Sequence, residues 1–298
     1  MKATDTGVGV SSTRAMMMLF PKEKHLFEDP YSEKVLTPYY KFWFILMRST
    51  KIFNSLIKSM EKRSPGALGW FFCRTRYIDD VLRDCISNKE IKTVVNLGAG
   101  MDCRAYYIPG LEGISYFEID HPSVIDKKKK IVKKILNELP DHVSFIPIDF
   151  DSQSLSTALD ENGYDPASKT LFIWEGVTQY ISKEANDDTL KYVAQAAPGS
   201  EIVFTYVLKS FISGEYVHDA VKTLYKRVCK ASNPLFIYGL DPTGIRDHLE
   251  RYSLSLIEEV GSEEFENRYI RSVDLDLQIK PFDIERFVLA EVKDPSKK

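Results

Sequence analysis

The sequence is poor in cysteine. Its 298 residues contain four cysteines with no C-x-x-C spacing among them, at Cys73, Cys85, Cys103 and Cys229. This pattern favours neither a zinc site nor a disulfide framework, so we expect reduced thiols and no bound metal. Reduced thiols are typical of a cytoplasmic protein.

Long apolar runs and an excess of positive charge are lacking too. The apolar run 42–47 has six residues, far fewer than the ~20 that span a bilayer. The first 20 residues lack the apolar core of a signal peptide. The net charge of −3 gives no electrostatic case for nucleic acid. We therefore expect a cytoplasmic protein that binds neither nucleic acid nor a membrane.

The first 90 residues carry helical patterns and no strand pattern. Residues 1–12 are small and polar, which indicates a frayed terminus. The residues after them favour helices, one opening at Asp29-Pro30-Tyr31, one over 42–60 and one over 68–85. The sequence therefore predicts an N-terminal helical cap over residues 1–90.

Seven short apolar runs follow, and helical patterns alternate with them. The runs cover residues 91–97, 114–119, 143–148, 171–174, 201–208, 254–260 and 287–292. Such alternation predicts an α/β fold, with helices on both faces of a mostly parallel sheet. This core would span 91–298, with one insert near 211–235 that favours an amphipathic helix and another near 262–285.

The first of these runs ends in a glycine turn. Gly98 and Gly100 lack a Cβ atom, so the backbone there can turn sharply and approach a ligand closely. Asp120 lies 20 positions after Gly100, where a nucleotide-binding βαβ unit places a carboxylate on the ribose hydroxyls. Cys103 stands where a dinucleotide fingerprint has its third glycine. The pattern favours a nucleoside without a pyrophosphate, of which S-adenosylmethionine is the common example.

Acidic residues follow the next strands as well. Asp149 comes after the third run and Glu175 after the fourth. Ligands of such sheets bind at the carboxyl ends of the strands. Each acid alone could be an ordinary loop residue, but four successive strands that end in glycine or acid predict a binding site at this edge.

Basic residues outside the sheet give weaker signals. Arg76 can pair with Asp79 or Asp80 on one helix face, whereas Arg74 has no acidic partner three or four residues on and is a candidate anion ligand. The lysine run over 127–134, in a helix that opens at Pro122, favours a solvated helix face.

The blocks NLGAGMDCRAYYI and YFEIDHPSVIDKKK resemble the leucine carboxyl methyltransferase family, which includes protein phosphatase methyltransferases and bacterial polyketide-type O-methyltransferases. FFCRTRYIDD, IPIDF and FIWEGVTQYIS extend the resemblance over about residues 14–201, and LQIKPFDIERF matches more weakly. The family implies the Rossmann-like, seven-stranded class I methyltransferase sheet, with an N-terminal helical cap and helical inserts.

The resemblance also implies a cofactor and the residues that hold it. The cofactor would be S-adenosyl-L-methionine. The residues would be Gly98, Ala99 and Gly100 beside it, Asp120 on the ribose, Asp149 and the backbone of Phe150 on the adenine, Arg74 on the methionine carboxylate, and Glu175 near the amino group. Arg14 is the nearest match to a further basic residue of the family.

By the same resemblance the protein is an O-methyltransferase. Its partner would be a small-molecule or peptide acceptor that carries a carboxylate or a hydroxyl. A carboxylate needs no general base, and no histidine beside a motif has a clear role as a base, since His121 follows Asp120 and is expected to shape the turn. Carboxyl methylation is therefore favoured. No catalytic residue is assigned; Glu175 and Tyr180 are candidates for positioning, and Tyr180 is equally well a core aromatic.

Two other functions stay open from the sequence. A nicotinamide-dependent oxidoreductase could use the same fold, although Cys103 and the lack of an obvious Tyr-x-x-x-Lys pair count against it. A non-catalytic relative could keep the nucleoside pocket without turnover.

Overall fold

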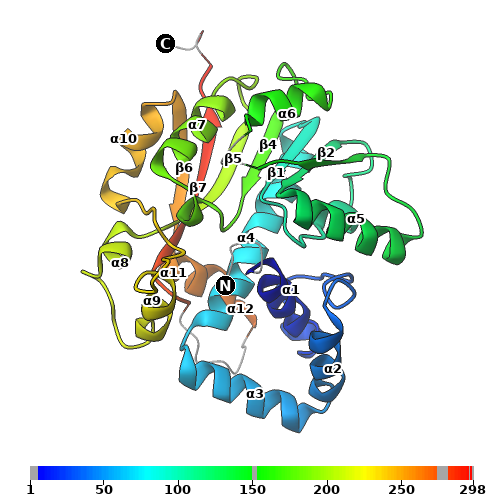
Figure 1. Ribbon diagram of the computed structural model, residues 1–298, viewed down its shortest axis with the longest axis vertical. Coiled ribbons are helices and arrows are strands. Elements are labelled where there is room, and N and C mark those ends of the chain that lie inside the picture. The colour runs from blue at the N-terminus through cyan, green and yellow to red at the C-terminus, as the bar shows by residue number, and fades with distance from the viewer. Residues whose placement is uncertain (1–5, 150–152, 274–280, 295, 297–298) are drawn as a thin grey trace.

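Seven strands form one sheet in the computed structural model, which describes residues 6–149, 153–273, 281–294 and 296. The strand order is β3-β2-β1-β4-β5-β7-β6 (Figure 1). The strands are β1 (Thr93–Leu97), β2 (Ser115–Asp120), β3 (Val143–Pro147), β4 (Thr170–Trp174), β5 (Glu201–Val207), β6 (Leu254–Val260) and β7 (Glu285–Val292).

The sheet is mostly parallel, as predicted. Strands β1 to β5 pair in parallel, and β7 runs antiparallel between β5 and β6. β1 pairs with both β2 and β4, so the strand order reverses there. A reversal of this kind opens a crevice at the carboxyl ends of the strands, where ligands of such folds bind.

Helices cover both faces of the sheet. Neighbouring side chains of β1 enter opposite cores, Val94 one and Val95 the other, because successive side chains of a strand alternate between the two faces. The helices of the core are α5 (Pro122–Leu136), α6 (Leu155–Glu161), α7 (Lys183–Val193), α8 (Lys209–Ser213), α9 (Lys222–Val228), α10 (Ile245–Glu250), α11 (Ser262–Phe265) and α12 (Arg271–Val273).

The N-terminal part consists of helices, as the sequence predicts. They are α1 (Thr6–Met17), α2 (Pro38–Met47), α3 (Thr50–Arg63) and α4 (Ala67–Asn88). The last of these buries 13 residues and packs onto the sheet, where the ring of Tyr77 lies 5.4 Å from that of Phe287 in β7. In Figure 1, α1, α2 and α3 lie together at one end of the molecule.

Three local predictions for the cap are wrong. Residues 1–12 do not all fray, because α1 begins at Thr6 and packs on α4, which a local pattern cannot reveal. Asp29 opens turns and no helix, since its carboxylate accepts hydrogen bonds from the Tyr31 and Ser32 amides. The helix predicted over 42–60 is two helices, with a break after Met47.

The insert predicted as one amphipathic helix contains two short ones. Gly214 adopts φ +90° and ends α8. A Cβ atom at this glycine would lie 2.3 Å from the Tyr225 hydroxyl. Any other residue would therefore clash at this turn. The second insert holds α11, a π-helical turn over Glu266–Ile270 and α12; its Tyr269 and Phe282 are buried. Residues 274–280 lie outside the described residues.

Within the part of the chain that the structure describes, no helix combines the length and the apolar character that a membrane crossing needs.

Candidate functional site

The glycine turn folds back over the end of β2. The amides of Gly98 and Ala99 both donate to the carbonyl oxygen of Ile119, at 2.8 and 3.0 Å. The amide of Gly100 donates to Asp120 Oδ2 at 2.7 Å. Burial raises the pKa of Asp120 above its usual value, while hydrogen bonds from the Gly100 and His121 amides oppose the shift. The structure thus brings together the glycines and the acid that the sequence singled out.

A second loop packs closely on this turn. A Cβ atom at Gly98 would lie 2.3 Å from Cγ2 of Val177, and the residue adopts φ +75°. Val177 follows Glu175 and Gly176 at the end of β4. Only glycine can adopt this φ and leave room for the Val177 methyl group. The close contact between the loops after β1 and β4 therefore requires glycine at position 98.

The end of β3 lies beside the same acid. The amide of Ile148 donates to the carbonyl oxygen of Asp120 at 2.9 Å. Asp149 comes next and is half-buried, and its amide donates to Gln153 Oε1 at 2.9 Å. Phe150, the other residue predicted to bind the adenine, lies outside the described residues. Asp149 is therefore at the carboxyl edge of the sheet, as predicted.

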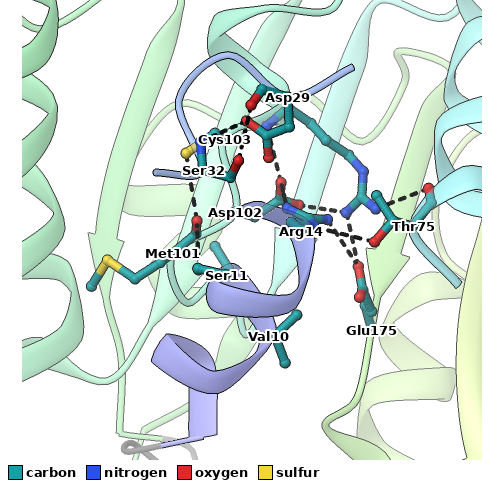
Figure 2. A network of polar contacts seen from close by, with 12 residues as sticks. Val10, Ser11, Arg14, Asp29, Ser32, Thr75, Met101, Asp102, Cys103 and Glu175 are labelled. Carbon is teal, nitrogen blue, oxygen red and sulfur yellow. Dashed lines mark hydrogen bonds and ion pairs between the residues drawn. The ribbon is translucent and has the colours of Figure 1, made fainter. Parts of the chain in front are cut away.

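Three arginines from three different segments surround Glu175. Arg74 Nε donates to Glu175 Oε1 at 2.7 Å, and Arg104 Nη1 donates to Oε2 at 2.8 Å. Arg14 Nη2 lies 3.6 Å from Oε2. Figure 2 shows the Arg14 side chain reaching from α1 toward both Glu175 and Asp102. These ion pairs connect the end of β4 to the helices of the cap.

These arginines keep Glu175 ionised. Burial acts to raise its pKa, but the guanidinium groups of Arg104, Arg74 and Arg14 outweigh burial and lower the pKa to about 2. Glu175 is therefore a carboxylate at neutral pH, and it can accept a hydrogen bond from an ammonium group as it does from the guanidinium groups.

The sequence reasoning missed the centre of this network. Arg104 is fully buried and bonds to Asp79, Asp102 and Glu175 at 2.6, 2.7 and 2.8 Å. Asp102 also pairs with Arg14 at 2.8 Å, and the two arginines hold its pKa well below its usual range despite burial. Asp79, which the helix spacing offered to Arg76, turns inward instead.

One lysine of α5 corrects the prediction of a fully solvated face. Lys128 is buried; its ammonium group pairs with Glu118 Oε2 at 2.8 Å and donates to the carbonyl oxygen of Ala99 at 3.4 Å. Burial raises the pKa of Glu118 to about 7, although the ammonium group opposes this shift. A glutamate inside a buried strand is the sequence signal that could have indicated a buried cationic partner.

A second acid that the sequence reasoning missed lies on the other side of Arg74. Glu285 opens β7, opposite Val207 at the end of β5, and its Oε2 lies 3.8 Å from Arg74 Nη1. Its Oε1 is buried and has no hydrogen-bond partner among the described residues. Burial raises its pKa, while Arg74 and the Thr205 hydroxyl oppose the shift.

Tyr180 lies in a short 3-10 helix, Thr178–Tyr180, just past the loop that contacts the glycine turn. Its ring is half-buried and stacks edge-on against Phe236 at 5.3 Å. The contact joins the loop after β4 to the insert between β5 and β6. Tyr180 therefore packs where that insert meets the loop after β4.

A cavity of about 320 Å³ lies on the outer side of the network, between residues 22–28 and α4. Asp79, Arg76 and Arg83 are among its lining residues. It shares Asp79 with the network, but none of the predicted cofactor residues lines it.

The donors and acceptors of the carboxyl edge suit a cationic nucleoside. Asp120 offers a carboxylate at the end of β2, and Glu175 stays charged at the end of β4. Arg74 brings a guanidinium to the same edge. Together they can accept from ribose hydroxyls, attract an ammonium group and hold a carboxylate, which are the polar groups of S-adenosyl-L-methionine.

Sequence comparison places this chain beside known proteins. Residues 7–194, more than half of the chain, match the model of the leucine carboxyl methyltransferase family. A Mycobacterium avium protein, provisionally named an S-adenosyl-L-methionine-dependent methyltransferase, is 30% identical over 204 residues, covering 68% of this chain and 66% of that protein. The chain thus spans just under two thirds of that relative. A Mycobacterium marinum protein of the same name is 28% identical over 83% of this chain and 80% of its own.

Two solved structures share the fold. One, provisionally described as a methyltransferase from Thermobifida fusca, gives a TM-score of 0.58 at 15% identity and covers 82% of this chain and 89% of its own. A DUF574 family protein from Streptomyces avermitilis gives a TM-score of 0.54 at 13% identity and covers 80% of this chain and 88% of its own. The predicted seven-stranded, Rossmann-like class I methyltransferase fold is confirmed.

Proposed function

The chain belongs to the leucine carboxyl methyltransferase family, and from that membership we propose that it is an O-methyltransferase acting on a carboxylate of a small molecule or of a peptide C-terminus. S-adenosyl-L-methionine is its cofactor, because relatives that match most of its length are provisionally named methyltransferases that depend on this cofactor. The bound cofactor supplies a methyl group on a sulfonium, which an acceptor oxygen takes by in-line displacement.

The observation that carries the proposal is the charge state of the carboxyl edge. Glu175 is held as an anion by three arginines, while Asp120 lies beside the glycine turn. We assign Asp120 to the ribose hydroxyls, Asp149 to the adenine amino group, Arg74 to the methionine carboxylate and Glu175 to the ammonium group. Each of these roles is electrostatic or orienting, as a displacement that depends mainly on positioning requires.

A carboxylate acceptor is favoured because the described histidines serve other purposes. The ring of His121 accepts from the Ser123 amide at the start of α5, as the sequence predicts for a residue that shapes the turn. His218 bonds to Asp283, and the His248 ring packs against Tyr252. A carboxylate is already ionised at neutral pH and needs no base to remove a proton.

Calorimetric titration with S-adenosylhomocysteine tests the cofactor site. We expect Asp120→Ala and Arg74→Ala to weaken binding at least tenfold, about 1.4 kcal/mol. Asp126→Ala and Arg251→Ala replace the same residue types at exposed positions and should leave binding unchanged. If the folded wild-type protein fails to bind, the cofactor assignment is wrong.

The chemistry of the product tests the acceptor class. The protein would be incubated with methyl-labelled cofactor and panels of carboxylic acids, phenols and peptides with free C-termini. A methyl ester releases its label as methanol in mild alkali, whereas a methyl ether keeps it. Alkali-stable label would overturn carboxyl methylation, and cofactor binding without any labelled product would indicate a non-catalytic relative.

Glu285 favours a second candidate, methylation of a hydroxyl. A buried carboxylate with a raised pKa and one unpaired oxygen at the carboxyl edge is suited to accept the proton of a hydroxyl acceptor. Under this alternative, Glu285→Gln would abolish turnover of hydroxyl acceptors and remove the acidic limb of their pH profile, while cofactor binding would persist. Under carboxyl methylation, the same variant would keep its pH profile.

A further inference from the structure

Helix α2 is apolar on two opposite sides. Its ten residues, Pro38–Met47, include one charged residue, Lys41. Phe44 and Met47 are buried against the protein, whereas Tyr39 and Phe42 are 67% and 58% exposed. A helix that is apolar all round is normally covered on every side. One apolar side of α2 therefore faces solvent in the isolated chain.

The exposed apolar side chains lie on α2, and α3, which follows it directly and contacts it, adds one more. We call this set the α2–α3 patch, and it comprises Tyr39, Phe42, Trp43, Ile45 and Ile52. The Trp43 ring lies 6.4 Å from that of Tyr39 and 6.1 Å from that of Phe42. Only three other large apolar side chains among the described residues are exposed, and they are scattered at Tyr216, Ile237 and Ile257. Contiguous exposed patches of this kind mark interaction sites, whereas single exposed residues do not.

The helices that carry the patch are strongly basic. Residues 38–63 contain six basic side chains, Lys41, Arg48, Lys51, Lys58, Lys62 and Arg63, and a single acid, Glu61. Their net charge is +5, which leaves −8 for the rest of a chain whose total is −3. Glu61 accepts a hydrogen bond from the Gly66 amide, and Arg48 pairs with Glu33. The surroundings of the patch are complementary to an anionic partner.

We propose that the α2–α3 patch docks on the surface of a lipid bilayer that contains anionic lipids. Tryptophan, tyrosine and phenylalanine beside lysines are typical of helices that lie in the headgroup layer. A protein partner fits less well, because four of the six basic residues are lysines, and lysine is depleted at protein interfaces. The expectation that no membrane is bound rested on the lack of a spanning segment, and docking at the surface needs none.

The patch lies in the cap. In Figure 1, α2 and α3 are at the same end of the molecule as α1. That helix reaches the glycine turn region, where the Ser11 hydroxyl donates to the carbonyl oxygen of Met101. Docking would therefore turn the cap end of the protein, rather than the far end of the sheet, toward the lipid.

Vesicle sedimentation tests the proposal. We expect the full-length protein to sediment with phosphatidylcholine vesicles that contain about 30% phosphatidylglycerol, and at least tenfold more weakly with phosphatidylcholine alone. Phe42→Ser/Trp43→Ser and Lys51→Glu/Lys58→Glu should each weaken binding tenfold or more. These side chains are exposed, so circular dichroism should be unchanged.

Matched controls separate the patch from general stickiness. Ile237→Ser removes an exposed apolar side chain elsewhere, and Lys129→Glu/Lys130→Glu reverses two exposed charges on α5. Both should bind like the wild type. Loss of binding in the α5 variant alone would assign the attraction to the α5 lysines and overturn the proposal.

Trp43 provides a direct optical readout. The two other tryptophans, Trp70 and Trp174, are 3% and 1% exposed, whereas Trp43 is 44% exposed. Emission should shift to shorter wavelength on adding anionic vesicles, and Trp43→Phe should abolish the shift. An unshifted spectrum without sedimentation would overturn the proposal. A dimer in sedimentation equilibrium that Phe42→Ser/Trp43→Ser dissociates, without vesicle binding, would show instead that the patch is a protein interface.

Discussion

Glu175 belongs to a network of ion pairs between carboxylates and arginines. The guanidinium of Arg104 is shared by three carboxylates, while Arg14 bridges Asp102 and Glu175. All of these side chains are buried or nearly buried. A charge without a partner is costly in such surroundings. The network therefore holds α1, α4 and the glycine turn region in one arrangement and also sets the charge beside the proposed cofactor site.

Removing the shared guanidinium should destabilise the protein strongly. In Arg104→Met, Asp79, Asp102 and Glu175 each lose a partner at 2.8 Å or less. We expect the free energy of unfolding in urea to fall by about 3–5 kcal/mol. Lys191→Met breaks an ion pair whose side chains are 61% and 74% exposed and should lower the free energy of unfolding far less, because solvent screens such pairs. If the two variants lost the same free energy of unfolding, burial would not determine the cost of breaking these ion pairs.

Acid should weaken the protein through Glu175. Its pKa is about 2 in the folded state against an ordinary 4.5, so its stabilising contribution is complete above pH 4.5 and is lost as the pH falls toward 2. The free energies of unfolding of the wild type and Glu175→Gln should therefore converge by about 2 kcal/mol between about pH 6 and about pH 3. A gap that stays constant with pH would show that Glu175 has an ordinary pKa when folded.

The sequence predicts individual site residues where a local pattern fixes their place. Asp120 and Glu175 each follow a strand, and strand ends meet at one edge. Arg104 and Lys128 were missed because each also has a partner that is distant in the sequence: Arg104 reaches Glu175, 71 positions away, and Lys128 contacts Ala99, 29 positions away. Such pairs depend on the packing of whole elements.

At the scale of elements, the glycine turn is the joint between two strand ends. The loop after β1 and the loop after β4 contact each other at Gly98 and Val177. The left-handed φ at Gly98 and the nearby methyl group both exclude a Cβ atom. A change at this joint should disturb the carboxyl edge as a whole.

Gly98→Ala should destabilise the protein and weaken S-adenosylhomocysteine binding. The positive φ alone costs about 1–2 kcal/mol, and the contact with Val177 adds to that cost. In a Val177→Ala background the steric part should disappear, so Gly98→Ala should cost less there. Both quantities are accessible by urea unfolding and calorimetry.

Gly113→Ala is the control for this series. A Cβ atom at Gly113 meets nothing within 4 Å, so the change in stability should stay within about 0.5 kcal/mol. If Gly98→Ala behaves like Gly113→Ala, the two loops are looser than the structure indicates.

Strands and cap helices differ in how far the sequence determines them. The residues of β1 are buried on both faces, and a short apolar, β-branched run reports such an environment directly. The start of α1 has no comparable signal, since TGVGVSSTRAMM is a poor helix by composition. Tertiary packing onto α4 decides its conformation. In the second insert, Phe265 and Tyr269 likewise pack within the core.

For the whole molecule, α4 joins the two proposed parts. It starts inside the cap, leads into β1, and its buried residues share one apolar cluster with those of the sheet. The Trp70 ring lies 5.0 Å from that of Phe287, and Arg74 reaches Glu175. The boundary predicted at residue 90 thus lies just after α4, the helix whose apolar side covers the sheet.

A fragment of residues 91–298 should therefore not fold by itself. Without α4, the sheet face that contains Phe287 and Val203 would be open to water, and burial of apolar surface is the main stabilising contribution to folding. We expect this fragment to lack near-ultraviolet circular dichroism and to bind no S-adenosylhomocysteine. A fragment of residues 64–298, which keeps α4, should recover part of the signal, and the full chain should unfold in a single transition. A folded, cofactor-binding 91–298 fragment would instead make the core an independent domain, with α4 as part of a separable cap.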